Sequence, residues 1–264
     1  AGPANKQGRI AADNICGGNS RFHGSQGSSV LKLFGLTAAS TGINEKAAQA
    51  AGITYDKVVL FPASHATYYP GAQSMAMKVL YEKESLRLLG AQIVGGDGVD
   101  KRIDVLATAI RAKMTALELT ELDLSYAPPY SSAKDPVNMA GFMIEDLESG
   151  KVRQFHWNEV EDLPCDGRAT LLDVRTAWEY QRGHLDGFRN IPLDDLREHL
   201  DELDRGKPVY VNCQTGLRSY LACRLLTQYG FICAHLSGGY SFYQVVTKEQ
   251  QTARSAYPCG MEKL

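Results

Sequence analysis

A cysteine stands where a short apolar run gives way to a helical pattern. Cys213 closely follows the apolar segment 209–211, and a six-residue loop then runs from Cys213 to Arg218. Unpaired N–H groups and the dipole at a helix N-terminus favour an anion, so such sites lower the pKa of a cysteine below its free value of about 8.5. Gly216 lets the loop bend without a Cβ penalty, and Arg218 can add a fixed positive charge. The segment therefore indicates a thiolate nucleophile.

Short strands and helices that alternate beyond Gly150 must position this loop. The expected strands cover 170–174, 208–211 and 232–236, and the expected helices cover 177–181, 193–203 and 217–228. Such alternation favours an α/β fold with a central parallel sheet and helices on its faces. In an open parallel sheet the site lies beyond the carboxyl ends of the strands, and Cys213 stands at such an end.

The second half of the chain resembles a single rhodanese domain, the sulfurtransferase fold. The resemblance covers 152 to about 245 and rests on five segments in the family order: 171–175, 183–187, 190–192, 213–218 and 238–240. It implies that Cys213 carries a persulfide, taking sulfane sulfur from a donor and passing it to a nucleophile. Backbone N–H groups of the loop would hold the terminal sulfur, and they belong to Gln214, Thr215, Gly216, Leu217 and Arg218.

The length of the loop separates two chemistries that use a cysteine in this position. Related phosphatases have five residues between the cysteine and the arginine and hold a tetrahedral phosphate, whereas Cys213 and Arg218 are separated by four. The smaller loop suits sulfur better. Three alternatives stay open: a Cys-dependent phosphatase or arsenate reductase on the same loop, a non-catalytic dimerisation and docking module, and a Cys213 that is only a buried structural thiol.

Other polar residues near these motifs are expected to be structural. Asp173 and Arg175 are predicted to hold the loop by ion pairing, and His184 to order the loop before Asp186 rather than to carry a proton. The remaining cysteines are predicted to be buried structural thiols, with those at 223 and 233 in the core: Cys16, Cys165, Cys223, Cys233 and Cys259. For Cys259, which lies in the tail, an accessible thiol stays open as the alternative.

Residues 28–145 have a mixed pattern. The expected strands cover 30–34 and 57–61, and a hairpin joins 75–81 to 87–94. The expected helices cover 45–51 behind an Asn44 cap, a segment that opens at Asp100, and 136–147. Strands in hairpins with helices segregated between them favour an α+β domain.

The first half looks like the C-terminal part of a flavoprotein disulfide reductase, in which the end of an FAD domain is followed by a dimerisation domain. The segments that carry this resemblance are 1–14, 36–42, 64–71, 101–104 and 124–132. The subfamily it most resembles is coenzyme A-disulfide reductase, in particular its fusion with a rhodanese domain, also described as NADH-dependent persulfide reductase. We therefore predict four parts: an FAD-domain remnant (1–27), a dimerisation domain (28–149), a rhodanese domain (150–246) and a tail (247–264).

The same resemblance implies ligands and partners. The parent enzyme would use FAD, NAD(P)H and coenzyme A, and would form a homodimer through residues 28–149. Its sulfur substrates would be low-molecular-weight persulfides, thiosulfate, or coenzyme A disulfides and persulfides. A tyrosine in each of two motifs would approach the redox cysteine of the partner subunit. Motif position assigns Tyr68 and Tyr126 to this role, and Tyr69 competes with Tyr68 for it.

The flavin side of this resemblance is incomplete. Lys6, Gln7 and Arg9 would face the flavin in the parent enzyme, but no GxGxxG followed by a ribose-binding acid occurs, so neither dinucleotide-binding fold is expected. The chain opens without a methionine on a helical pattern, which suggests a piece of a longer protein. On its own it is expected to bind no cofactor fully and to reduce nothing with NADH.

Composition argues against several other classes of protein. A formal net charge of −2 gives no basic field for nucleic acid, and no apolar run approaches the ~20 residues of a membrane span. Six scattered cysteines without CxxC spacing indicate neither a disulfide scaffold nor a metal site. We therefore expect a cytoplasmic protein that binds neither nucleic acid nor membrane.

Overall fold

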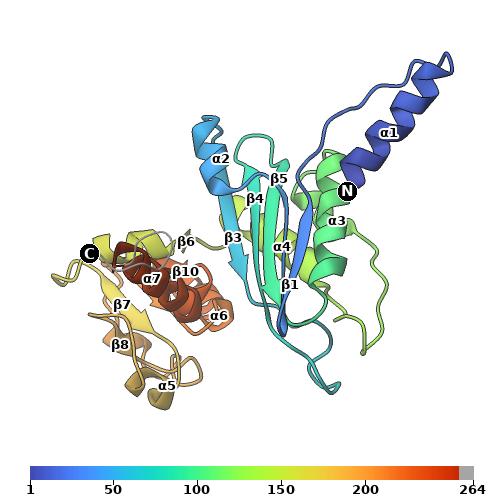
Figure 1. The fold of residues 1–264 in the computed structure, drawn as a ribbon. Helices are drawn as coiled ribbons and strands as arrows, with labels where there is room; N and C mark the ends of the chain where they lie inside the picture. Colours follow the sequence, from blue (N-terminus) through green and yellow to red (C-terminus); the bar gives the residue numbers. More distant parts are fainter. Residues whose placement is uncertain (256–264) are drawn as a thin grey trace.

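The computed structural model describes residues 1–255, which form two lobes, each built around a sheet (Figure 1). An α+β lobe precedes an α/β lobe, as the sequence predicts. Cys259 and the other residues of 256–264 lie outside this range. None of the helices within residues 1–255 has the length and hydropathy needed to cross a membrane.

The first lobe holds an antiparallel sheet with the strand order β1-β2-β5-β4-β3. Burial alternates along much of β4 because successive residues of a strand face opposite sides: Met75, Met77 and Val79 are buried. Two helices pack on this sheet and enclose the core, α3 (Val99–Arg111) and α4 (Pro136–Glu148). The strands are β1 (Ser29–Leu33), β2 (Leu36–Gly42), β3 (Tyr55–Leu60), β4 (Met75–Glu82) and β5 (Leu88–Gly95).

Side-chain caps fix where two helices of this lobe begin. Asn44 accepts a 2.9 Å hydrogen bond from the Ala47 N–H and starts α2 (Glu45–Ala50), as predicted. Asp135 accepts from the Val137 N–H at 3.0 Å and starts α4. A short 3₁₀ helix, η1 (Leu117–Glu121), lies between α3 and α4.

The second lobe holds a parallel sheet with the strand order β6-β10-β9-β7-β8. Its strands are β6 (Gln154–Phe155), β7 (Thr170–Asp173), β8 (Arg189–Asn190), β9 (Val209–Asn212) and β10 (Cys233–Leu236). Its helices are η2 (Trp157–Asp162), α5 (Ala177–Gln181), η3 (Leu200–Glu202), α6 (Leu217–Gln228) and α7 (Gly239–Ser255). The parallel arrangement predicted from the alternating pattern is confirmed.

The predicted helix over 193–203 is wrong. This segment forms successive turns that end in η3. Its backbone bonds run from residue i to residue i−3, as from the Leu196 N–H to the Leu193 carbonyl. Acidic residues spaced three and four apart along the segment would repel one another on an α-helix. The turns still bury Leu196 and Leu200.

The two longest elements without a counterpart in the sequence prediction are β2 and α7. β2 consists largely of Ala, Ser, Thr and Gly, and lacks the apolar β-branched and aromatic residues typical of strands. α7 begins beside a Gly-Gly pair, which is typical of a turn, and continues through Ser255. The segment 247–255, predicted as the start of a polar tail, is therefore the end of a helix.

At the other end of the chain, α1 (Gly2–Ile15) projects away from the first lobe (Figure 1). None of its residues is buried. A helix at the opening of the sequence was predicted and is confirmed.

The two lobes contact each other at the edge strand β3. The Val59 N–H donates a 3.2 Å hydrogen bond to the Ser237 hydroxyl, and the Gln154 side chain donates at 2.8 Å to the Lys57 carbonyl. Edge strands carry unpaired backbone groups, so these bonds satisfy part of the free edge of the first sheet. The second lobe is thereby bonded to β3 through Gln154 of β6 and through Ser237, which directly follows β10.

Candidate functional site

Cys213 follows β9 directly, at the carboxyl end of a strand inside the parallel sheet, as predicted. The loop leads into α6, and Gly216 is the N-cap of this helix with a φ of 102°. Glycine adopts such left-handed conformations without a Cβ clash, which explains this residue type at the bend. The Cys213 side chain is enclosed by the loop, and the residue is only 1% exposed.

The sulfur of Cys213 has two polar contacts. The Gly216 N–H donates to Sγ at 3.1 Å, and the thiol donates to the Ser219 hydroxyl at 3.3 Å. Ser219 is fully buried and donates in turn to the Gly216 carbonyl at 3.0 Å. A hydroxyl can rotate, so Ser219 can redirect its proton to the sulfur when the thiol is ionised. The sequence reasoning did not identify Ser219.

The loop also presents backbone N–H groups without an acceptor. Within the described part of the chain, no hydrogen bond is donated by the N–H groups of Gln214, Thr215, Leu217 and Arg218. Such groups at the first turn of a helix attract an anion. A negatively charged atom bound to the Cys213 sulfur would therefore find donors already in place.

The start of α7 holds the opposite side of the loop. The Tyr240 N–H donates to the Cys213 carbonyl at 2.8 Å, and the Ser241 N–H to the Gln214 carbonyl at 2.9 Å. Gly239 packs so closely that a Cβ there would lie 2.6 Å from the Cys213 carbonyl oxygen. The carbonyls of Cys213 and Gln214 are thus occupied and unavailable to a ligand.

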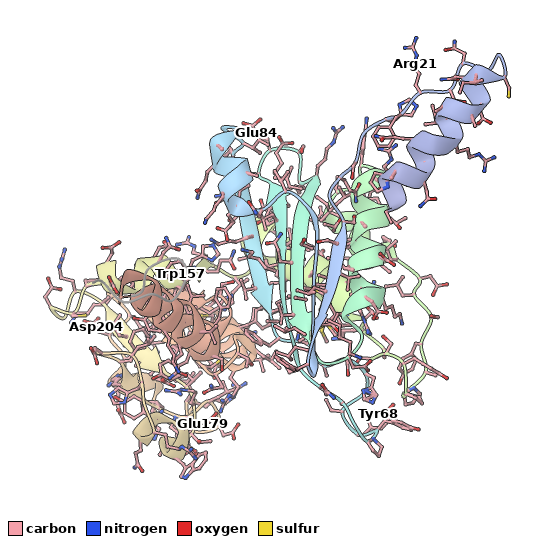
Figure 2. All side chains as sticks on the ribbon, in the orientation of Figure 1. Arg21, Tyr68, Glu84, Trp157, Glu179 and Asp204 are labelled. Atoms are coloured by element: carbon pink, nitrogen blue, oxygen red, sulfur yellow. The ribbon has the colours of Figure 1, made fainter. Side chains whose placement is uncertain are left out.

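Arg218 was expected to offer its positive charge to the thiolate, but its hydrogen bonds go to Glu179. The guanidinium donates at 2.8 and 2.6 Å to the two carboxylate oxygens of this α5 residue, which Figure 2 labels in the second lobe. These bonds lower the pKa of Glu179 to about 2, and Glu179 raises the pKa of Arg218. Cys213 adds to that rise, so Arg218 lies within electrostatic range of the sulfur.

Glu179 is positioned by the start of its own helix. Thr176 is the N-cap of α5, and its backbone N–H and hydroxyl donate to the Glu179 carboxylate at 2.9 and 2.8 Å. The Thr-x-x-Glu spacing of this capping box is readable in the sequence. Its partner Arg218 is not, because the two residues are far apart along the chain.

The predicted ion pair between Asp173 and Arg175 is confirmed. Nη2 of Arg175 lies 2.8 Å from Oδ2 of Asp173, and both side chains are buried. Arg175 also donates to Oε1 of Gln214 at 3.1 Å, and Gln214 donates to the Ser241 hydroxyl at 2.7 Å. The Gln214 side chain therefore holds the loop in place and leaves only its backbone N–H for a ligand.

His184 contacts α5, as a structural role requires. Its ring stacks on Tyr180 with the ring centroids 3.8 Å apart, and Nδ1 lies 3.1 Å from the Tyr180 carbonyl oxygen. This contact agrees with the predicted ordering role.

The remaining cysteines divide into two groups. Cys223 and Cys233 are buried in the core, as predicted. Burial raises the pKa of Cys223, while hydrogen bonding with Cys223 lowers the pKa of Cys233 to about 7. Cys16 and Cys165 are exposed, so their prediction as buried structural thiols is wrong. Cys16 follows the exposed helix α1, and Cys165 lies in a surface loop.

The two tyrosines predicted from the first half lie together. The hydroxyls of Tyr68 and Tyr126 are 2.9 Å apart, and this hydrogen bond raises the pKa of Tyr126. Both side chains are exposed. Tyr69 packs edge-on against His65 instead, with the ring centroids 5.8 Å apart. Figure 2 shows Tyr68 on a loop of the first lobe, well separated from Glu179 in the second.

A buried arginine ties together the loops that carry these tyrosines. Arg102 donates to the Ser64 carbonyl at 2.9 Å, to the Ser131 hydroxyl at 3.1 Å and to the Asp135 carboxylate at 2.9 Å. Arg102 is 1% exposed and Asp135 is 3% exposed. Ser64 precedes Tyr68 in one loop and Ser131 follows Tyr126 in the other, so this network fixes the relative position of the two loops.

Lys6, Gln7 and Arg9 lie on exposed faces of α1. Arg9 lines an open groove of about 550 Å³ between α1 and the segment 19–23, and Figure 1 shows α1 far from α6, the helix that follows the Cys213 loop. Within residues 1–255 no sheet packs against α1, and the side chains of Lys6, Gln7 and Arg9 are exposed. The residues present therefore do not form a flavin site, and no chemical step is assigned to FAD or NAD(P)H.

Comparison with known proteins gives a match for each lobe. Residues 29–136 match the pyridine nucleotide-disulphide oxidoreductase dimerisation domain, and residues 156–245 match the rhodanese-like domain. A coenzyme A disulfide reductase of Staphylococcus haemolyticus is 41% identical over 145 residues, which cover 54% of this chain and 32% of that protein.

Two solved structures match both lobes together. Reduced CoADR-RHD from Bacillus anthracis has 46% sequence identity and a TM-score of 0.88, over 94% of this chain and 44% of that one. A NAD-dependent persulfide reductase from A. fulgidus has 42% identity and a TM-score of 0.81, over 90% and 43%. The chain thus spans about a third of the curated relatives and less than half of these structures. It joins a dimerisation domain of the pyridine nucleotide-disulphide oxidoreductase family to a rhodanese-like domain.

Proposed function

We propose that Cys213 carries sulfane sulfur, and that the chain is the dimerisation and sulfurtransferase part of a coenzyme A-disulfide or persulfide reductase. The observation that carries the proposal is the structure of the Cys213 loop. Its enclosed thiol lies beside four backbone N–H groups that have no hydrogen-bond acceptor in residues 1–255. Similarity over both lobes to CoADR-RHD and to a persulfide reductase supports it.

The transfer proceeds in two balanced displacements. The Cys213 thiolate attacks the sulfane sulfur of a donor, a new S–S bond forms, and the old S–S bond breaks with its electron pair leaving on the donor's thiolate. The loop N–H groups of Gln214 to Arg218 stabilise the terminal sulfur of the resulting persulfide. A second nucleophile, such as a thiolate or cyanide, then takes this sulfur and returns Cys213 as a thiolate.

The residues around the sulfur divide into two roles. The backbones of Gln214, Thr215, Gly216 and Leu217 bind the transferred sulfur. Arg218 shapes the loop by joining α6 to α5 through its paired hydrogen bonds to Glu179, and this carboxylate balances its charge. The loop supports a Cys-dependent phosphatase less well, because four residues between Cys213 and Arg218 leave less room for a tetrahedral phosphate than the five residues of the related phosphatases.

The first lobe contributes a second, separate set of residues. It forms the homodimer, and the phenols of Tyr68 and Tyr126 approach the redox cysteine of the partner subunit, where they donate hydrogen bonds to a coenzyme A thiolate or protonate it. In the complete reductase FAD and NAD(P)H would supply the electrons, and Lys6, Gln7 and Arg9 of α1 would face a flavin only together with the rest of an FAD domain. The free thiols of the described residues are consistent with a cytoplasmic location.

Mass spectrometry after incubation with glutathione persulfide tests the sulfurtransferase proposal. We expect the mass of one added sulfur atom on Cys213 in the wild-type chain and none at this position in Cys213→Ala. Cys165→Ala, which removes an exposed thiol far from the loop in sequence, is the matched control and should accept sulfur like the wild type. A folded wild-type chain that never gains sulfur on Cys213 would favour the docking module instead.

Cyanide or thiol acceptors then test turnover. The wild-type chain should release the bound sulfur to them, and Cys213→Ala should not. Equal turnover by the two proteins would refute the proposal, and hydrolysis of an aryl phosphate that depends on Cys213 would support the phosphatase in its place.

A further inference from the structure

Each arginine that contacts the Cys213 loop is paired with its own carboxylate. Arg218, in the loop, donates two hydrogen bonds to Glu179, and Arg175, which bonds Gln214, pairs with Asp173. Two guanidinium groups are thus balanced by two carboxylates. These four side chains carry no net positive charge, although two arginines lie beside the loop.

An anion in this loop is therefore held mainly by dipoles. The unpaired N–H groups at the start of a helix amount to roughly half a positive charge. That is enough to favour a single negative charge on one sulfur atom. A dianion would need a further positive charge to offset its desolvation in an enclosed loop.

The rim of the loop is apolar, which independently favours an alkyl persulfide over thiosulfate as the sulfur donor. Leu217 lies inside the Cys213–Arg218 loop, and its side chain is 65% exposed. A sulfonate group that enters beside Leu217 loses hydrogen bonds to water and meets an apolar surface. The methylene groups next to an alkyl persulfide instead bury apolar area against it.

We infer that Glu179 is a specificity-determining residue that keeps dianionic sulfur donors such as thiosulfate out of the Cys213 loop, by occupying Arg218. Alkyl persulfides, whose reacting sulfur end carries a single negative charge, remain the favoured donors. This inference rests on the proposed sulfur transfer through Cys213. With an alkyl persulfide the leaving group is the alkyl thiolate, and with thiosulfate it is sulfite; in both, one S–S bond forms as another breaks, and no further oxidant or reductant takes part.

The test compares two donors on three proteins. Rates of sulfur loading on Cys213 are measured by mass spectrometry with glutathione persulfide and with thiosulfate, for the wild type, Glu179→Gln and Glu159→Gln. A neutral amide in place of the Glu179 carboxylate cannot neutralise Arg218, so loading by thiosulfate should rise about tenfold relative to loading by glutathione persulfide. Glu159→Gln is the matched control, because Glu159 belongs to the capping box of η2 in the same lobe and has no arginine partner among residues 1–255.

Glu159→Gln removes the same unit of charge and should keep the wild-type preference. An equal gain in Glu159→Gln would assign the effect to net charge and overturn the role of Glu179. So would an unchanged preference in a folded Glu179→Gln. The wild type decides the matter even if that variant fails to fold, since equal loading by both donors contradicts the inference. Loading by neither donor contradicts the proposed function itself.

Discussion

The Val59 N–H of the first lobe donates a 3.2 Å hydrogen bond to the Ser237 hydroxyl of the second. Ser237 directly precedes the Gly238-Gly239 pair, and Gly239 packs against the Cys213 carbonyl. One continuous stretch of backbone therefore contacts the edge of the first sheet on one side and the sulfur loop on the other. The geometry of the loop depends on this stretch, and glycine is required there for lack of space.

Gly239→Ala should disable the loop while the chain stays folded. A Cβ at this position would lie 2.6 Å from the Cys213 carbonyl oxygen and 2.8 Å from the Thr215 nitrogen, so the loop has to shift. Displacements of this kind at a reacting group cost about tenfold to a hundredfold in rate. We expect such a loss in sulfur transfer from glutathione persulfide to cyanide.

Gly230→Ala is the control for this substitution. Gly230 also has a positive φ, of 84°, but a Cβ there meets no atom within 4 Å. Both variants should lose about 1–2 kcal/mol of unfolding free energy from the left-handed backbone. Only Gly239→Ala should lose transfer, and a fully active Gly239→Ala would show that the contact with the Cys213 carbonyl does not position the sulfur.

Tyr68→Phe should change the titration of Tyr126. The hydrogen bond between the two hydroxyls raises the pKa of Tyr126, so its loss should return that pKa toward the ordinary tyrosine value. NMR of ring-labelled tyrosine across alkaline pH measures this directly. Tyr130→Phe is the control, since Tyr130 is similarly exposed at 73% and its hydroxyl has no partner among the described residues. A Tyr126 titration that does not move in Tyr68→Phe would mean that the hydroxyl contact is not formed in solution.

The main chain of the sulfur site could be predicted from the sequence, whereas its charge balance could not. The strand before Cys213, the loop and the following helix could be predicted, because each depends on residues close together in the sequence: an apolar run for the strand, Gly216 for the bend, and a helical apolar pattern after it. The pairing of Arg218 with Glu179 joins residues of α6 and α5 that lie 39 positions apart in the sequence, which no local pattern encodes. The same limit explains the exposed Cys165, whose burial is decided by the loop around it rather than by its residue type.

The ion pair between Glu179 and Arg218 should make stability depend on acid pH. The pKa of Glu179 falls from 4.5 to about 2 on folding, so the folded chain gains stability from this carboxylate above pH 4.5 and loses it as the pH falls toward 2. The melting temperature of Glu179→Gln should therefore lie below that of the wild type at pH 7. The two values should converge as the pH falls from 4.5, and a difference that stays constant over that range would contradict the pairing.

His235 should make the wild-type chain sensitive to mild acid. Its imidazole is 4% exposed, and neither ring nitrogen has a hydrogen-bond partner in the described structure. Burial lowers its pKa from 6.5 to about 4, with a smaller contribution from His156. Between pH 6.5 and about 4, His235 therefore binds a proton in the unfolded chain but not in the folded chain. Stability should fall by about 1.4 kcal/mol for each pH unit from 6.5 toward 4.

His235→Leu removes this proton uptake and fills the same apolar site, so its unfolding free energy should change less between pH 6.5 and 5 than that of the wild type. Urea unfolding at several pH values measures the difference. His199→Leu is a control of opposite sign, because Glu202 raises the pKa of His199 and this exposed pair stabilises the fold below pH 6.5. Its loss should slightly increase acid sensitivity. If His235→Leu and the wild type lose stability in parallel, the buried imidazole is paired or hydrated in solution and does not set the acid limit of the fold.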